Sequence, residues 1–116
     1  MARARQAVVV TEWTNLFVVL IEGDFAQPID LDLLGMALEV GHLTGKQVAV
    51  DVSRIQTMSA EVLNVLLQHR HRAGTLPWLV GPLGAPAARR LEITGTLPHF
   101  RIFPALPEAL DCSRDG

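Results

Sequence analysis

The sequence has one cysteine, nearly balanced charge and no long apolar run, and each shortage excludes a class of protein. The single Cys112 leaves no internal disulfide and no thiolate metal cluster, and favours a reducing, cytoplasmic compartment. A net charge of −2 gives no electrostatic footprint for nucleic acid. The runs AVVV, after Arg3 and Arg5, and LFVVLI are too short for a signal peptide or a bilayer span. We therefore expect a soluble protein with no direct membrane insertion.

Apolar residues are plentiful, at 49% of the 116 residues. A chain of this length can bury roughly two-thirds of its unfolded surface in a single core. No repeat, linker or low-complexity tract interrupts the sequence. We place one domain at residues 7–110 and expect the polar DCSRDG segment, 111–116, to be a disordered tail.

The first third of the chain predicts a hairpin and then a helix. β-branched runs at 7–13 and 16–21 are separated by two polar residues, and the second run, being continuously apolar, should be the inner strand. Asp30 is placed to cap the helix that follows, and Gly41 or Gly45 should close it.

The rest of the chain alternates strand and helix. The expected strands lie at 48–52, 76–80 and 99–103, and the expected helices run from Ala60 to Gly74, from near Pro86 to Gly95, and over 106–110. This order predicts an α/β fold with a mixed, mostly parallel sheet of about four or five strands, a hairpin at its edge and about four helices. Crossovers this short favour a compact binding module over an enzyme with a loop-built pocket.

The stretch 48–67, VAVDVSRIQTMSAEVLNVLL, is the centre of this plan. Its alternating valines predict a buried strand, Ser53 to Ser59 a polar loop, and the lengthened period from Ala60 a helix. A helix N-terminus would then lie at the carboxyl edge of the sheet, where open α/β folds place their ligand and partner contacts.

Several motifs in this order resemble one known family. LIEGDFA ends the second run with Gly23, Asp24 and Phe25, and the strand at 48–52 ends in Asp51-Val52-Ser53. The segment from LVGPLGAP to LPEAL follows at the matching distance. Together they are similar to the STAS domains, named for sulfate transporters and anti-sigma factor antagonists, over about residues 8–110. The resemblance implies the STAS fold.

The resemblance also exposes a departure at the family's phosphorylation motif, Asp-Ser-Ser-Gly. In anti-sigma factor antagonists its first serine accepts phosphate from a kinase that is also the anti-sigma factor, and the added charge blocks binding. The corresponding residues here are Ser59, Ala60, Glu61 and Val62. Ala60 has no hydroxyl, so the usual switch is missing. A one-residue slip in the loop would make Ser59 the acceptor, which keeps it as a minor phosphorylation candidate.

The resemblance implies a non-enzymatic protein-interaction module in bacterial signalling, binding an anti-sigma factor or serine-kinase-like partner. The alternative is a constitutive accessory or scaffold subunit of an ABC-type lipid transporter or a stress-signalling complex. Homodimer formation stays open. The partner-binding residues are expected at the two loops and the first helical turn: Gly23, Asp24, Phe25, Ser53, Arg54, Thr57, Ser59, Ala60 and Glu61.

Ordinary structural roles compete with these assignments. Ser59 is placed to be a helix N-cap, accepting from the N–H of Glu61 or Val62, and Asp51 with Ser53 to fix the loop by hydrogen bonds.

His69 and His71 point to nearly opposite sides of their helix and are expected to be solvated, so no metal site is predicted. Residues 81–86, GPLGAP, lack the lysine of a P-loop and should only turn the chain, with nucleotide binding as a second alternative. No nucleophile, base and orienting group can be combined, so we predict no enzyme activity and no cofactor.

Overall fold

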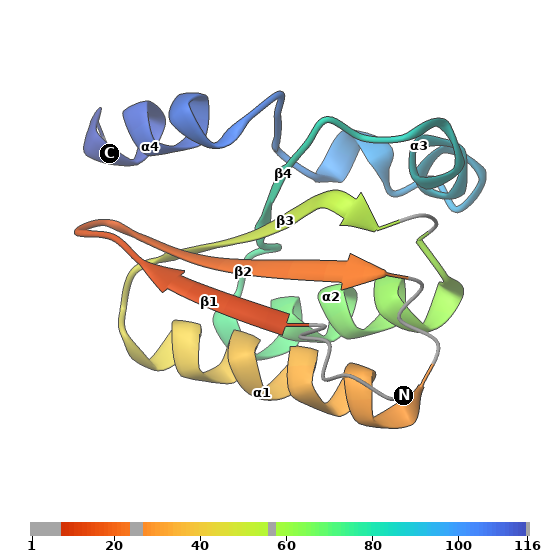
Figure 1. Cartoon of the computed structure of the whole chain (residues 1–116), viewed down its shortest axis with the longest axis horizontal. Coiled ribbons are helices and arrows are strands. Elements are labelled where there is room, and N and C mark those ends of the chain that lie inside the picture. The colour runs from red at the N-terminus through yellow and green to blue at the C-terminus, as the bar shows by residue number, and fades with distance from the viewer. Residues whose placement is uncertain (1–7, 24–26, 56–57, 116) are drawn as a thin grey trace, which may run out of the picture.

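The protein forms a five-stranded mixed sheet in the order β1-β2-β3-β4-β5 (Figure 1). This computed structural model describes residues 8–23, 27–55 and 58–115. The strands are β1 (Val8–Glu12), β2 (Leu16–Gly23), β3 (Gln47–Ile55), β4 (Trp78–Val80) and β5 (Ile102–Phe103). β1 pairs antiparallel with β2, and all later neighbours are parallel. The predicted hairpin, inner strand and mostly parallel sheet are confirmed.

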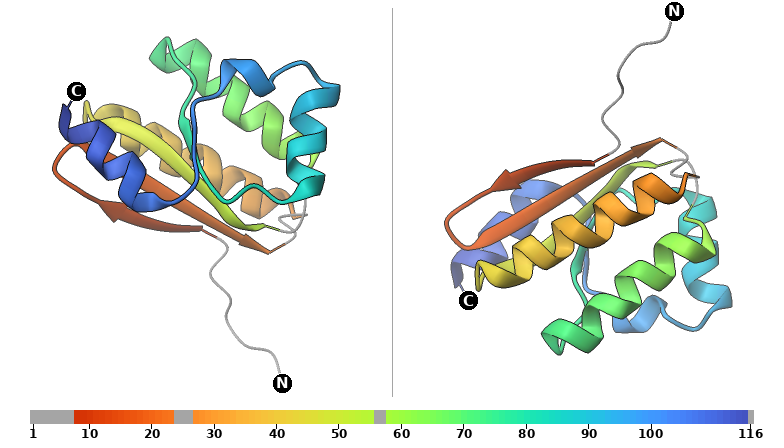
Figure 2. Two further views of the ribbon diagram at one scale, coloured as in Figure 1. Left: turned by 90° about the horizontal axis from the view of Figure 1, so that it is seen from above. Right: turned by 90° about the horizontal axis from the view of Figure 1, so that it is seen from below.

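Helices lie on both faces of this sheet (Figures 1 and 2). They are α1 (Pro28–Leu43), α2 (Ala60–Ala73), α3 (Ala85–Ile93) and α4 (Leu106–Asp115), with a short 3-10 helix, η1 (Leu97–His99). α1 and α2 cover one face side by side, and α4 lies against the other. Because consecutive strand residues point to opposite faces, a strand covered on both sides must be apolar throughout. That explains the uninterrupted apolar run of β2.

Two apolar cores result from this arrangement. Phe17, Val19 and Ile21 of β2 face α1 and α2 in the larger core, together with Leu34, Leu38, Val50, Val62 and Leu66. Leu16 and Val18 face the smaller core beneath α4, together with Ala49, Val80, Phe103 and Ala109.

The start of α1 differs from the sequence prediction, whereas its end agrees with the Gly45 alternative. Its N-cap is Gln27, with Pro28 in the first turn, so the prediction that Asp30 caps the helix is wrong. Proline is well suited to the first helical position because its fixed φ is helical and no N–H is needed there. α1 ends at Leu43, and Gly45, at φ 76°, turns the chain out of it. Gly41 lies inside the helix instead of closing it.

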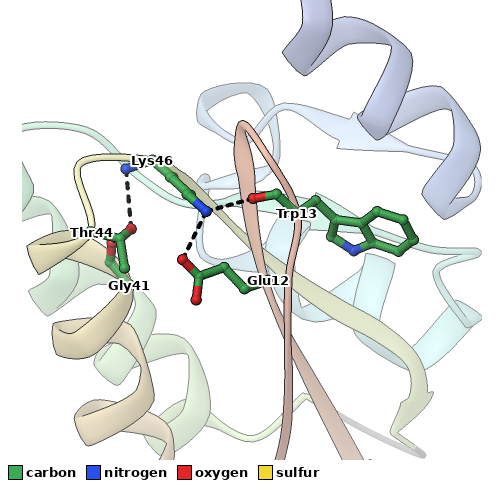
Figure 3. A network of polar contacts seen from close by, with 5 residues as sticks. All are labelled: Glu12, Trp13, Gly41, Thr44 and Lys46. Carbon is green, nitrogen blue, oxygen red and sulfur yellow. Dashed lines mark hydrogen bonds and ion pairs between the residues drawn. The ribbon is translucent and has the colours of Figure 1, made fainter.

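A lysine fixes the hairpin tip to the loop between α1 and β3 (Figure 3). Lys46 Nζ donates to Glu12 Oε2 and to the carbonyl oxygen of Trp13, both at 2.7 Å. The backbone N–H of Lys46 donates to Thr44 Oγ1, whose hydroxyl in turn donates to the Gly41 carbonyl. The two bonds of Lys46 Nζ join segments more than 30 residues apart and tie the hairpin to the loop that follows α1.

The last segments also depart from expectation. The strand predicted at 99–103 is only Ile102–Phe103, because η1 occupies Leu97–His99. The disordered tail predicted from residue 111 is wrong for 111–115, which continue α4. Ser113 is buried there, and its hydroxyl donates to the Leu110 carbonyl at 2.8 Å. The polar composition of this segment concealed an apolar side, formed by Ala109, Leu110 and Cys112, that packs on the sheet.

Candidate functional site

The candidate site lies where the carboxyl ends of β2 and β3 meet the N-terminus of α2 (Figure 1). β2 and β3 are parallel, and their last paired residues are Gly23 with Ile55 and Glu22 with Arg54. α2 starts five residues after the end of β3. Two strand ends and one helix N-terminus therefore share this edge of the molecule, as the central stretch predicted.

β3 is longer than expected and irregular near its end. The strand continues to Ile55, so the polar loop predicted from Ser53 begins later than expected. The register shifts between the pair Leu20–Asp51 and the pair Glu22–Arg54, so β3 contains one residue more than β2 over this interval. Such a bulge bends the strand and redirects its side chains.

Asp51 and Ser53 hold this irregularity in place. Asp51 Oδ1 accepts from the Ser53 backbone N–H at 2.9 Å and from the Ser53 hydroxyl at 2.6 Å. The predicted role of the two residues as hydrogen-bond partners that fix the backbone is confirmed. Ser53 and the following Arg54 are exposed at the end of the strand.

Ser59 is the N-cap of α2. Its backbone is extended, and its Oγ accepts from the Val62 N–H at 3.1 Å. This satisfies one of the helix's free N–H groups, as the sequence predicted. Ala60 and Glu61 follow in the first turn and are exposed, so the carboxylate of Glu61 lies near the positive end of the helix dipole.

Met58 and Arg90 fix the start of α2, and sequence reasoning missed both. Met58 is almost wholly buried, and its carbonyl oxygen accepts from Arg90 Nε at 3.1 Å. Met58 is an apolar residue in an otherwise polar segment, which was an available signal for an anchor. Arg90 gave none, because the contact joins residues 32 positions apart.

The predicted partner-binding residues divide into three groups. Ser53, Arg54, Ala60 and Glu61 are exposed, while Gly23 and Ser59 are half-buried. Asp24, Phe25 and Thr57 lie outside the described residues. The exposed group carries one cation, Arg54, and one anion, Glu61. The described part of this surface is therefore exposed and carries both signs of charge.

The histidines of α2 have different environments. His71 is exposed as predicted, but His69 is buried, so the prediction that both are solvated is wrong. The His69 ring meets that of His42 edge to face, with centroids 6.3 Å apart. Burial, and then the neighbouring His42, lower the pKa of His69 below 6.5. Among the described residues, no three histidine, cysteine or acidic side chains are grouped to hold a metal ion.

Gly81, at the start of the loop 81–86, has a structural role. A Cβ on Gly81 would lie 2.6 Å from the Leu83 nitrogen, so this position needs glycine for steric reasons. The Gly81 N–H donates to the Phe103 carbonyl at 2.7 Å and joins the loop to β5. Elsewhere, none of the described helices has the length and apolar character needed to cross a membrane.

Comparison with known proteins identifies the fold. No family model matches the chain, and no curated protein is significantly similar to it in sequence. Solved structures match nearly its whole length. An anti-sigma factor antagonist from Mycobacterium paratuberculosis gives a TM-score of 0.76 at 19% identity, over 92% of each chain.

Two further structures agree. The anti-sigma factor antagonist SpoIIAA in its unphosphorylated form gives a TM-score of 0.76 at 13% identity, over 95% of this chain and 98% of the other. An anti-sigma-factor antagonist (STAS) domain protein from Planctomyces limnophilus gives a TM-score of 0.75 at 11% identity, over 92% of this chain and 97% of the other. The chain therefore has the STAS fold, and the predicted fold class is confirmed.

Proposed function

We propose that this chain, which has the STAS fold, is a protein-interaction module of the anti-sigma factor antagonist kind that lacks the phosphorylation switch. Its partner is an anti-sigma factor or a related kinase-like protein. The partner contacts the end of β3, at Ser53 and Arg54, and the first turn of α2, at Ala60 and Glu61. The proposed function is binding, without catalysis.

One observation carries this proposal: the only serine beside the switch position is occupied as a helix cap. Ser59 Oγ accepts from the Val62 N–H, and the next residue, exposed Ala60, has no hydroxyl. Phosphorylation of Ser59 would alter the same oxygen that caps the first turn of α2. We therefore assign Ser59 to structure and the exposed neighbours to the partner.

The same Ala60 supports a second candidate function, a constitutive accessory or scaffold subunit in a transporter or stress-signalling complex. Such a subunit would bind its partner permanently and need no switch. The two candidates use the same surface and differ in the partner. Purification from the native cell, followed by intact-mass measurement, distinguishes them by identifying the partner and any phosphate.

The proposed surface is tested by a charge reversal with a matched control. Glu61 and Glu108 are both exposed acidic residues in the first turn of their helices, α2 and α4. Glu61→Lys should weaken capture of the partner at least about tenfold, because it places a cation at the centre of the contact, whereas Glu108→Lys should leave capture unchanged. Equal capture by both variants would show that the surface is wrong.

A second substitution separates binding from stability. Ser59→Asp introduces a negative charge but keeps a good N-cap residue. We expect the thermal midpoint to stay close to that of the unsubstituted chain while partner capture falls. If the thermal midpoint and partner capture both fall, the substitution damages α2. Partner capture by Glu61→Lys is then the test of the surface.

A further inference from the structure

α1 carries a second apolar stripe that faces away from the core. The outer residues are Ile29, Leu33, Met36, Val40 and Leu43, and all five are exposed, Met36 to 64% and Leu43 to 74%. The inner face is separate and packs on the sheet through Leu34 and Leu38. A surface helix normally keeps its apolar residues on the face toward the core and polar residues on the opposite face. In Figure 1, α1 lies at the lower edge of the molecule, beneath the sheet.

The spacing of the outer stripe is that of a helix pair. Successive members are four, three, four and three residues apart, which is the repeat that places one side chain per turn along a seam between two helices. Met36 and Val40 line both grooves beside α1, one toward β1 and one toward α2. Met36 and Val40 therefore lie along the centre of the stripe, between the two grooves.

The stripe is nearly symmetric about Met36. Leu33 and Val40 lie three and four positions to either side of it, and Ile29 and Leu43 lie seven. In an antiparallel pair of α1 helices centred on Met36, Ile29 would face Leu43 of the other copy and Leu33 would face Val40. A two-fold contact requires such a self-complementary surface.

The charges beside the stripe also favour an antiparallel second copy. α1 contains no lysine or arginine, and Glu39 is paired within its own chain with Arg72 at 3.1 Å. In the antiparallel arrangement the two exposed Asp32 side chains stand eight positions apart along the axis, about 12 Å. That exceeds the screening length of about 8 Å at physiological ionic strength. A parallel pair would place them side by side.

Gly35 is an interior glycine of α1 that no contact within the fold requires. Glycine in a helix interior costs about 1 kcal/mol relative to alanine. Gly41 has a reason within the fold, since a Cβ there would lie 2.6 Å from Phe17 Cδ1. Gly35 has no such reason, because no described residue beyond its chain neighbours and the adjacent helix backbone comes within 4 Å of its would-be Cβ. Gly35 lies about 100° around the helix from Met36 and lines the groove toward α2, so the space it leaves belongs to that groove and not to the stripe.

We propose that the outer stripe of α1 is the interface of a homodimer, in which a second copy of this chain packs its own α1 antiparallel across Met36. This interface lies apart from the first turn of α2, so it does not rest on the proposed function. It would allow one dimer to present two partner-binding edges.

Sedimentation equilibrium of the full chain, over a wide range of concentration, tests the proposal. We expect a monomer–dimer equilibrium. Met36→Lys should raise its dissociation constant at least about 100-fold, since each substitution at a two-fold axis acts in both copies. The matched control is Ile93→Lys, at an apolar residue 73% exposed at the end of α3, which should change the constant less than about twofold.

Cross-linking identifies the contact directly. In a Cys112→Ser background, Met36→Cys should form a covalent dimer under mild oxidation, and Ile93→Cys should stay monomeric. A chain that is monomeric at every concentration, or a dimer unaffected by Met36→Lys, would overturn the proposal. If the unsubstituted chain is monomeric, a different protein must be sought as the partner that covers the stripe.

Discussion

Arg90 Nε on α3 donates a hydrogen bond to the Met58 carbonyl oxygen, 3.1 Å away. Met58 immediately precedes the N-cap of α2 and is itself buried. α3 thereby holds the residue from which the candidate site begins. The contact makes the geometry of the first turn of α2 depend on a helix that follows it by more than ten residues.

Arg90→Met should loosen the start of α2. The substitution keeps most of the aliphatic stem and removes the donor, so the Met58 carbonyl loses its partner. We expect the free energy of unfolding to fall by about 1 kcal/mol, a typical value for one hydrogen bond. Amide hydrogen exchange should become faster in residues 58–63. Urea denaturation and exchange mass spectrometry measure the two effects.

The neighbouring Arg89 provides the control. It is exposed, and its side chain makes no hydrogen bond with any residue that the structure describes. Arg89→Met should change neither stability nor exchange. Protection of residues 58–63 that is the same in both variants would show that Arg90 does not hold the loop.

Patterns of short range predicted most of this fold. The alternating valines of β3 and the lengthened period from Ala60 located a strand and a helix correctly, and the N-cap role of Ser59 followed from its place at their junction. The errors at α1 and α4 came from local signals too. Pro28 was a stronger start signal than Asp30, and a polar composition concealed the buried side of α4 around Ser113.

The burial of His69 could have been predicted from the sequence, but the hydrogen bond from Arg90 to Met58 could not. His69 continues the buried face of α2 set by Val62 and Leu66, at spacings of four and three, so its burial could have been predicted. The bond from Arg90 to Met58 could not, because it depends on how α3 folds back toward α2. Contacts between distant elements are fixed by tertiary packing and leave no periodic signal in one sequence.

The two interior glycines of α1 should respond to alanine in opposite ways. At Gly41 an added Cβ would meet Phe17 Cδ1 at 2.6 Å and Val48 Cγ2 at 2.9 Å. Overpacking of this kind costs about 1–3 kcal/mol. At Gly35 the space is open, and Gly35→Ala should stabilise the monomer by up to about 1 kcal/mol through helix propensity.

Thermal or urea denaturation at low protein concentration measures both effects without contribution from self-association. Each variant is the control for the other, because both make the same change in the same helix. Destabilisation by Gly35→Ala at low concentration would show that the open space in the groove between α1 and α2 is needed within the single chain.

Buried His69 should make stability fall in weakly acidic solution. Its pKa is lowered first by burial, then by the charges of His42 and Arg72, and Glu39 only partly opposes this. The unfolded chain therefore takes up a proton near pH 6.5 while the folded chain still resists it. The free energy of unfolding is then highest above pH 6.5 and decreases as pH falls from there toward the lowered pKa of the folded state.

Urea denaturation across this pH range should give a slope that His69→Leu reduces. His71→Leu, at an exposed position on the same helix, separates the effect of the buried ring from that of deleting a histidine. A proton NMR titration of the His69 ring gives the folded-state pKa directly. If the ring titrates at or above 6.5, or if His69→Leu keeps the full slope, protonation of His69 does not oppose folding. The loss of stability in acid must then come from another group.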